Sequence, residues 1–165
     1  MSEPAKILIV DDDKSIRKVL AEILKDEGYT VETAENGKEA MQKADTSFYN
    51  VALLDLKLPD IAGMEVLRVF TKTHPSMMTI LITGYADLQS AMEALNLGAS
   101  AYIQKPIDHE ALDRTIKECL KKQQTFILRS EIPSSLRKPE IRAMLRAVEE
   151  GKITAFKPSY SYEKG

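Results

Sequence analysis

The chain has 165 residues, of which 44% are hydrophobic and 29% are charged, and its formal net charge is −2. This balance is ordinary for a globular protein of one domain with a short appendage, and no apolar run approaches the roughly 20 residues of a membrane span. The single cysteine, Cys119, excludes an internal disulfide and the N-terminus lacks a signal-peptide pattern, so we expect a cytoplasmic protein without membrane contact.

Two kinds of segment alternate along the chain: short apolar or alternating runs, and stretches with helical periodicity. The runs predict strands at residues 5–10, 30–34, 51–54, 77–82 and 101–104. The periodic segments predict helices between Asp13 and Gly28, from residue 37 to about 44, at 64–73 and 86–97, and after Asp108. The first of these helices carries apolar residues at the spacing of one helix face: Ile16, Val19, Leu20, Ile23 and Leu24.

The order of these elements predicts the architecture. Predicted strands begin roughly every 21 to 28 residues with a helix between them, which is typical of right-handed βαβ units. We therefore expect an α/β fold of the flavodoxin-like, doubly wound kind, with a five-stranded parallel sheet in the order 2-1-3-4-5 and five helices. A short, mainly helical C-terminal extension follows. In this order ligands bind beyond the carboxyl ends of strands one and three, where the chain reverses direction.

Polar residues follow four of the predicted strands, at the end where ligands are expected. Asp11 and Asp12 come after the first strand, Asp55 after the third, Thr83 after the fourth and Lys105 after the fifth. An acid in such a place is most often only a helix cap. All of these groups at one edge of a sheet, however, suit Mg²⁺ and a phosphoryl group. The cation requires oxygen ligands, and the phosphoryl oxygens require hydrogen-bond donors and positive charge.

Four motifs carry a resemblance to a known family. They are ILIVDDD (residues 7–13), VALLDLKLPD (51–60), TILITGY (79–85) and GASAYIQKP (98–106). With them, residues 4–122 resemble the receiver domain of response regulators, the CheY-like family of two-component signal transduction. The resemblance implies the fold described above and a protein that accepts a phosphoryl group from a histidine kinase onto an aspartate.

The resemblance also implies roles for individual residues. Asp55 matches the phosphoacceptor, whose carboxylate attacks phosphorus and forms an acyl phosphate. Asp11 and Asp12 match the acidic pair that holds Mg²⁺ together with Asp55, and the backbone carbonyl of Lys57 is expected as a further ligand. The side chains of Lys57 and Tyr85 are expected to flank the path of the hydrolytic water and so to tune the lifetime of the phosphorylated state; the alternative is that both are simple surface residues.

Three further residues match the part of the family that responds to phosphorylation. Lys105 resembles the lysine that pairs with the phosphoacceptor and later with a phosphoryl oxygen. Thr83 resembles the switch hydroxyl, which donates to another phosphoryl oxygen, and Tyr102 resembles the aromatic switch residue of the fifth strand. Output is expected on the face of the fourth helix, fifth strand and fifth helix. These helices offer Leu88, Ala91, Met92, Leu95, Asn96, Leu112 and Ile116, some of which must belong to the core.

The C-terminal segment differs from the rest of the chain in charge. Residues 1–120 contain 13 Lys and Arg against 20 Asp and Glu, a net charge of −7, whereas residues 121–165 contain 10 against 5, a net charge of +5. We divide the chain into a receiver domain (1–122) and an extension of unknown role (123–165). In the extension we expect the fifth helix to continue, a further helix near 139–150, and a loose end.

Two functions remain open from the sequence. The first is a stand-alone receiver, phosphorylated by a sensor histidine kinase or a phosphotransfer protein, which acts on a downstream protein target. A homodimer through the output face is a further candidate assembly. The second is a DNA-associated transcriptional regulator, or the receiver fragment of a longer one, whose basic tail binds nucleic acid. An enzyme with an aspartate nucleophile is disfavoured, because the chain has no insertion long enough to cap a substrate pocket.

Overall fold

Five parallel strands form one sheet in the computed structural model, which describes residues 3–84, 88–131, 143, 146–147 and 150–151. The order is β2-β1-β3-β4-β5, so the predicted topology is confirmed. Its strands are β1 (Lys6–Val10), β2 (Thr30–Ala34), β3 (Val51–Leu54), β4 (Met78–Thr83) and β5 (Ala101–Gln104).

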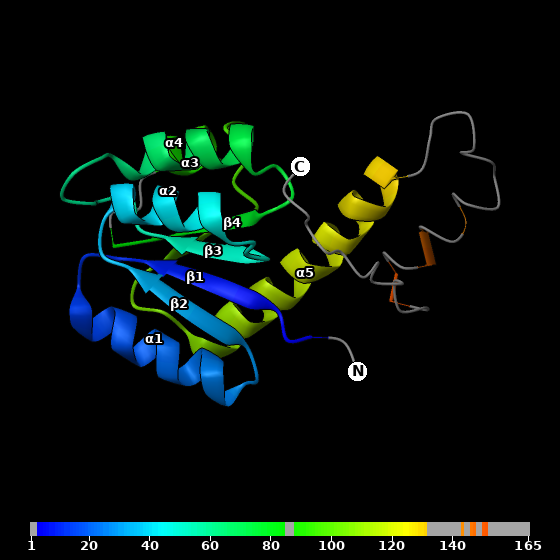
Figure 1. Cartoon of the computed structure of the whole chain (residues 1–165), viewed down its shortest axis with the longest axis horizontal. Helices are drawn as coiled ribbons and strands as arrows, with labels where there is room; N and C mark the ends of the chain where they lie inside the picture. Colours follow the sequence, from blue (N-terminus) through cyan, green and yellow to red (C-terminus); the bar gives the residue numbers. More distant parts are fainter. Residues whose placement is uncertain (1–2, 85–87, 132–142, 144–145, 148–149, 152–165) are drawn as a thin grey trace.

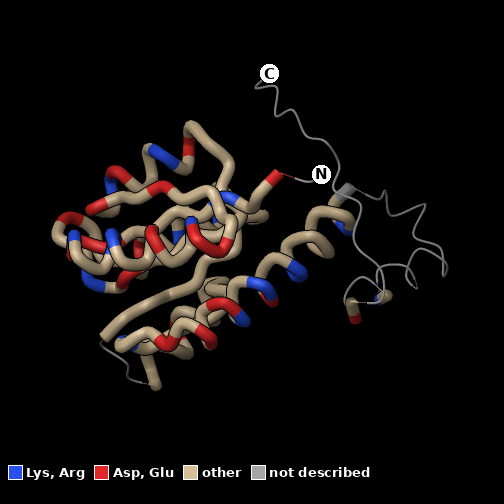
Figure 2. The backbone as a smooth tube through the Cα atoms, turned by 90° about the horizontal axis from the view of Figure 1, so that it is seen from below, with Lys and Arg blue, Asp and Glu red and all other residues tan. Residues whose placement is uncertain are grey.

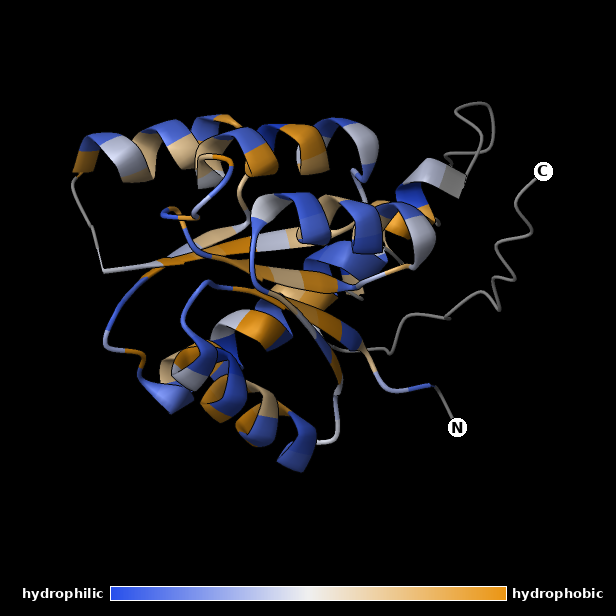
Figure 3. Cartoon of the chain, turned by 60° about the vertical axis from the view of Figure 1, so that its left-hand side comes forward, coloured by the Kyte–Doolittle hydropathy of each residue, from blue (hydrophilic) through white to orange (hydrophobic). Residues whose placement is uncertain are grey.

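Helices cover both faces of the sheet and complete a three-layer sandwich. They are α1 (Lys14–Asp26), α2 (Gly37–Thr46), α3 (Gly63–Thr73), α4 (Leu88–Asn96) and α5 (His109–Glu131). Figure 1 shows α1 and α5 on one side of the sheet and α2, α3 and α4 on the other. Coloured by hydropathy, the strands form an apolar layer between helices whose outer faces are hydrophilic (Figure 3).

The core consists of two apolar clusters, one on each face of the sheet. Successive side chains of a strand point to opposite faces. Leu8 and Val10 of β1 therefore join the cluster beneath α2, α3 and α4, whereas Ile7 and Ile9 join the cluster beneath α1 and α5. Burial on both faces explains why the strands are continuous apolar runs in the sequence.

The boundaries of α1 are set by residues that the sequence analysis identified. Asp13 is the N-cap, and its side chain accepts hydrogen bonds from the amides of Ser15 (2.8 Å) and Ile16 (3.3 Å). Gly28 lies just beyond the helix with φ of +98°, a left-handed conformation that favours glycine and ends the helix. Elsewhere the boundaries shift by a residue or two: β4 includes Thr83, and α4 ends at Asn96.

The structure corrects one predicted apolar face and decides which residues of another belong to the core. Val19, which the helical spacing placed on the inner face of α1, is 52% exposed, because the helix turns Leu20 and Leu24 toward the sheet and leaves Val19 at the margin. Leu112 and Ile116, which were offered as parts of the output face, are fully buried in the cluster beneath α1 and α5.

The cysteine lies in the same cluster, as its helical spacing indicates. Cys119 is 1% exposed, and burial raises the pKa of its thiol to about 11. A thiol that stays protonated is a poor nucleophile. Cys119 therefore contributes to packing rather than to chemistry.

A buried polar network attaches α5 to the amino edge of the sheet. Gln123 is 2% exposed, and its Nε2 donates to the backbone carbonyls of Asn50 (3.0 Å) and Ser76 (2.8 Å). Its Oε1 accepts from Nδ2 of Asn50 (2.9 Å), whose Oδ1 in turn accepts from the amide of Lys6 (2.8 Å). The network joins the starts of β1 and β3 to α5, at a residue beyond the boundary predicted at 122.

Past this network α5 continues away from the sheet (Figure 1). Its exposed basic residues follow the helix toward its carboxyl end (Figure 2); they are Arg114, Lys117, Lys121, Lys122 and Arg129. The helix predicted near 139–150 lies mostly outside the described residues, as does the segment 152–165.

Within the described part of the chain, no helix combines the length and apolar character needed to cross a bilayer.

Replacement of Gln123 tests the network. In Gln123→Ala, Nδ2 of Asn50 and the carbonyl of Ser76 lose their hydrogen bonds to Gln123, so we expect the free energy of unfolding to fall by about 2 kcal/mol. Urea unfolding followed by circular dichroism measures this change. Gln124→Ala is the matched control, because Gln124 takes no part in the network, and an equal loss in both variants would contradict the assignment.

Candidate functional site

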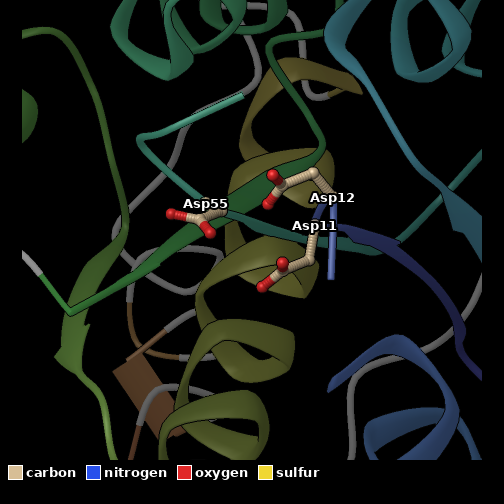
Figure 4. Close-up of side chains that lie close together, drawn as sticks. All are labelled: Asp11, Asp12 and Asp55. Carbon is tan, nitrogen blue, oxygen red and sulfur yellow. The ribbon is translucent and has the colours of Figure 1, made fainter. Parts of the chain in front are cut away.

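Three carboxylates converge at the carboxyl edge of the sheet. Asp11 and Asp12 follow β1, and Asp55 follows β3, which pairs directly with β1. Figure 4 shows the three side chains together, and one carboxylate oxygen from each lies within 4.8 Å of the others. Asp11 and Asp55 are buried, whereas Asp12 is exposed. Such a group of hard oxygen ligands, open to solvent on one side, suits a small divalent cation that keeps some of its waters.

Lys105 bridges two of these carboxylates from the loop after β5. Its Nζ lies 2.9 Å from Oδ2 of Asp11 and 3.0 Å from Oδ2 of Asp55, and donates to both. Burial alone would lower the pKa of Lys105, but the hydrogen bonds to Asp11 and Asp55 raise it above its usual value. The lysine is therefore positively charged at neutral pH and offsets part of the negative charge of the site.

The environment of Asp55 disfavours its ionised form. Burial of the carboxyl group raises its pKa, and the nearby charge of Asp11 acts in the same direction. Hydrogen bonds from Lys105 and from the backbone amide of Lys57 (3.1 Å) oppose this shift but do not cancel it. A cation beside the carboxylates would favour the ionised, nucleophilic form, so the residues present fit a bound Mg²⁺.

The loop that carries Asp11 is held from two directions. Oδ1 of Asp11 accepts from the amide of Asp13 at 2.9 Å, which closes the turn into α1. Arg17, one turn into that helix, donates from Nη1 to the backbone carbonyl of Asp11 at 2.7 Å and lies 3.9 Å from the carboxylate of Glu35. The guanidinium thus fixes the backbone beneath the acids.

The loop after Asp55 is folded tightly back on itself. The amide of Gly63 donates to the carbonyl of Leu56 at 2.9 Å. A Cβ atom at Gly63 would lie 2.4 Å from the backbone oxygen of Asp55, so no other residue fits there without movement. The loop between them includes Lys57, whose carbonyl was predicted as a metal ligand.

The two predicted switch residues lie on neighbouring strands. Thr83 is the last residue of β4 and is 1% exposed, and its carbonyl accepts from the amide of Lys105 at 2.9 Å. Tyr102 of β5 pairs in register with Leu81 and packs, partly buried, against the cluster beneath α2, α3 and α4. Tyr85, which was expected to flank the water path, lies outside the described residues.

The face of α4 carries the largest exposed apolar side chains near these strands. Leu88 is 77% exposed, Met92 55% and Leu95 51%. A shallow hollow runs along this helix and is lined by Leu88, Gln89, Met92, Glu93, Asn96 and Leu97. Such a cluster of exposed apolar residues is typical of a protein contact surface.

Sequence reasoning missed two residues that shape the site. Arg17 and Asp60 are ordinary charged residues in the sequence, and only the folded chain shows that Arg17 binds the Asp11 carbonyl and that Asp60 binds the amino end of α2. For Arg17 the available signal was its spacing, because it lies one helical turn after Asp13, the cap that follows Asp11. The contact of Asp60 spans 22 and 23 residues and had no local signal.

The comparison with protein families agrees with this geometry. The family model of the response regulator receiver domain matches residues 7–117. The chain belongs to this family. Receiver domains are signalling domains rather than classical enzymes, and the carboxylates, Lys105 and Thr83 lie at the edge of the sheet where the family resemblance placed its site residues.

Two curated relatives show the same similarity. The transcriptional regulatory protein ZraR of Klebsiella oxytoca is 35% identical over 118 residues, which cover 72% of this chain and 27% of that protein. GlrR of Escherichia coli, also a transcriptional regulatory protein, is 28% identical over 162 residues, which cover 93% of this chain and 34% of that protein. The chain therefore spans about a third or less of the length of these relatives.

Solved structures extend the similarity to three dimensions. A CheY-like receiver domain protein from Methanospirillum hungatei superposes with a TM-score of 0.71 and 45% identity, over 73% of this chain and 97% of that chain. The response regulator protein TrrA from Thermotoga maritima, in complex with Mg²⁺ and beryllium fluoride, gives a TM-score of 0.65 and 35% identity, over 70% and 99%. These matches confirm the receiver fold.

Proposed function

We propose that this protein is a phosphorylation-dependent response regulator that accepts a phosphoryl group from a sensor histidine kinase, or from a phosphotransfer protein, onto Asp55. One observation carries the proposal. Asp55 directly follows a fully buried strand, and Lys105 donates to the carboxylates of both Asp55 and Asp11. Burial of adjacent carboxylates is costly unless the site has a use for them, and transfer of a phosphoryl group to one of them is such a use.

In the proposed reaction a carboxylate oxygen of Asp55 attacks phosphorus in line with the donor. The new oxygen–phosphorus bond forms as the nitrogen–phosphorus bond of the donor histidine breaks, and the imidazole takes a proton from solvent. Nζ of Lys105 already lies 3.0 Å from Oδ2 of Asp55. It is therefore placed to donate to a phosphoryl oxygen once the group has been transferred. Thr83, at the same edge, would donate to a second oxygen.

Asp11, Asp12 and Asp55 would hold the Mg²⁺ ion, with the backbone carbonyl of Lys57 as a fourth protein ligand. The bound ion neutralises charge on the transferring phosphoryl oxygens. The complex of TrrA with Mg²⁺ and beryllium fluoride supports this choice of metal. Beyond this self-phosphorylation and the later hydrolysis of the acyl phosphate, we propose no enzymatic activity.

Phosphorylation by a small donor tests the proposal without a kinase. Wild-type protein incubated with phosphoramidate and Mg²⁺ is expected to gain the mass of one phosphoryl group, because the acceptor, the lysine and the metal ligands all belong to this chain. Intact-mass spectrometry measures the gain. EDTA and the Asp55→Asn variant are both expected to abolish it, and a modification that survives in Asp55→Asn would assign the acceptor to another residue.

The output of the phosphorylated protein is proposed to come from the face of α4, β5 and α5. Thr83 and Tyr102 lie on adjacent strands of the sheet. A movement of the Thr83 side chain toward the phosphoryl group would therefore change the packing next to the Tyr102 ring. The exposed residues Leu88, Met92 and Leu95 would then change position or partner. A downstream protein target is the proposed ligand of this face, and a second copy of the chain is the other candidate.

Removal of the Thr83 hydroxyl tests this coupling. In Thr83→Ala, Asp55 should still accept the phosphoryl group. The equilibrium constant between the inactive and active forms should shift toward the inactive form by about tenfold, the size of a typical allosteric coupling. Amide chemical shifts of α4, recorded with and without phosphodonor, report the change. Thr83→Ser keeps the hydroxyl and should behave as wild type; full phosphate-dependent shifts in Thr83→Ala would rule the coupling out.

A second output is favoured by the comparison with relatives. ZraR and GlrR are transcriptional regulatory proteins, and the similarity to GlrR extends over 93% of this chain, beyond the receiver domain. The basic residues of α5 and of the segment after it would serve such a regulator in contact with DNA. A gel shift on the full chain, repeated at several salt concentrations with and without phosphodonor, separates this output from one that uses protein contacts alone.

A further inference from the structure

The loop between β3 and α3, residues 55–63, forms one wall of the phosphorylation site and is fixed at its base. The amide of Lys57 donates to Oδ1 of Asp55 at 3.1 Å, and the amide of Gly63 donates to the carbonyl of Leu56 at 2.9 Å. The first bond closes the start of the loop, and the second holds its two ends together. They leave the middle of the loop, which includes the Lys57 carbonyl, to be oriented by other contacts.

Asp60 anchors the far end of this loop to a different helix. Its Oδ1 accepts from the amide of Gly37 and its Oδ2 from the amide of Lys38, both at 2.8 Å. Oδ1 also accepts from the amide of Ile61 in the loop itself at 2.8 Å. The carboxylate thus satisfies two amides at the amino end of α2, where the helix dipole favours negative charge.

The contact between loop and helix is also close sterically. A Cβ atom at Gly37 would lie 2.9 Å from Cγ2 of Val66 and 3.2 Å from Cβ of Ile61. The first turn of α2 therefore sits directly on the loop and on the start of α3. With both carboxylate oxygens engaged across this contact, the position of α2 and the path of the loop are fixed together.

The start of α3 does not supply an alternative anchor. Its N-cap is Ala62, whose side chain makes no capping hydrogen bond. Leu56, Leu58 and Ile61 pack against the core cluster on this face, but apolar contacts are not directional. The hydrogen bonds of Asp60 orient the loop from α2, and the hydrogen bond from the Asp55 amide to the Val10 carbonyl (3.0 Å) fixes the start of the loop on β1.

We infer that Asp60 is a positioning residue for the metal site, acting through the loop that carries the Lys57 carbonyl. This inference rests on the proposed phosphorylation of Asp55 with Mg²⁺. The carboxylate touches neither the metal nor the phosphoryl group. It holds α2 and the loop in register, so that the Lys57 carbonyl and the amide bound to Asp55 keep their directions.

Two readouts test the inference on the full chain. The first is hydrogen exchange of the Lys57 amide in metal-free protein, and the second is the dissociation constant of Mg²⁺ by calorimetry. Asp60→Ala should speed exchange at Lys57 and weaken Mg²⁺ binding by about tenfold, the low end for loss of a group that orients a metal ligand. Asp60→Asn keeps one acceptor oxygen and should fall between Asp60→Ala and wild type.

Asp45→Ala is the matched control. Asp45 lies at the other end of α2, its side chain is 71% exposed, and its loss removes the same charge; both readouts should stay at the wild-type values. In Asp60→Ala, the rate of phosphorylation should recover at saturating Mg²⁺, whereas a general loss of structure would lower it at every concentration.

The outcomes separate this inference from the proposed function. Unchanged Mg²⁺ affinity and unchanged Lys57 exchange in Asp60→Ala would overturn the positioning role, as would equal effects in Asp45→Ala or faster exchange throughout the chain. If wild-type protein bound no Mg²⁺, the proposed function would fail. Exchange at the Lys57 amide would then still decide whether Asp60 orients the loop.

Discussion

The ion pairs of Lys105 with Asp11 and Asp55 are the interaction on which the rest of the site depends. A parallel sheet brings the carboxyl ends of its strands to one edge, so acids that follow β1 and β3 must lie close together. Burial and the nearby charge of Asp11 disfavour the ionised form of Asp55, and Lys105, at 2.9 and 3.0 Å from the two acids, supplies a compensating charge from the loop after β5. Because this compensation is partial for Asp55, whose pKa remains raised, the site is suited to a further cation.

The two edges of the sheet are built for different purposes. At the amino edge, Gln123 joins α5 to Asn50 and Ser76 in a network where its amide oxygen and nitrogen both have partners. At the carboxyl edge, like charges are held together against their repulsion. This arrangement fits the general pattern in which binding sites sacrifice stability for function.

Much of the fold was predictable because its strongest signals are local. Strands buried on both faces read as continuous apolar runs, and their alternation with helices leaves one parallel topology that fits. The site followed from the same topology, since Asp11, Asp55 and Lys105 each come directly after a strand. Their proximity is now a structural finding, whereas their roles in phosphoryl transfer remain predictions.

The remaining features were not predictable from local sequence because they depend on contacts across the fold. Whether Val19 faces the sheet depends on the rotation of α1, and periodicity alone leaves that rotation uncertain. Leu112 and Ile116 are core residues because α5 packs beneath the sheet with that face inward. Asp60 and Gln123 have partners 22 to 73 residues away, and a polar residue with a distant backbone partner looks like any surface residue.

The central claim is that Asp55 becomes an aspartyl phosphate, and its most direct test is chemical location of the modified residue. Borohydride reduction converts an acyl phosphate on aspartate to homoserine, which peptide mapping then identifies. After treatment with phosphoramidate and Mg²⁺, we expect homoserine at position 55 alone, and none when EDTA replaces Mg²⁺. Homoserine at another position, or at none, would contradict the account.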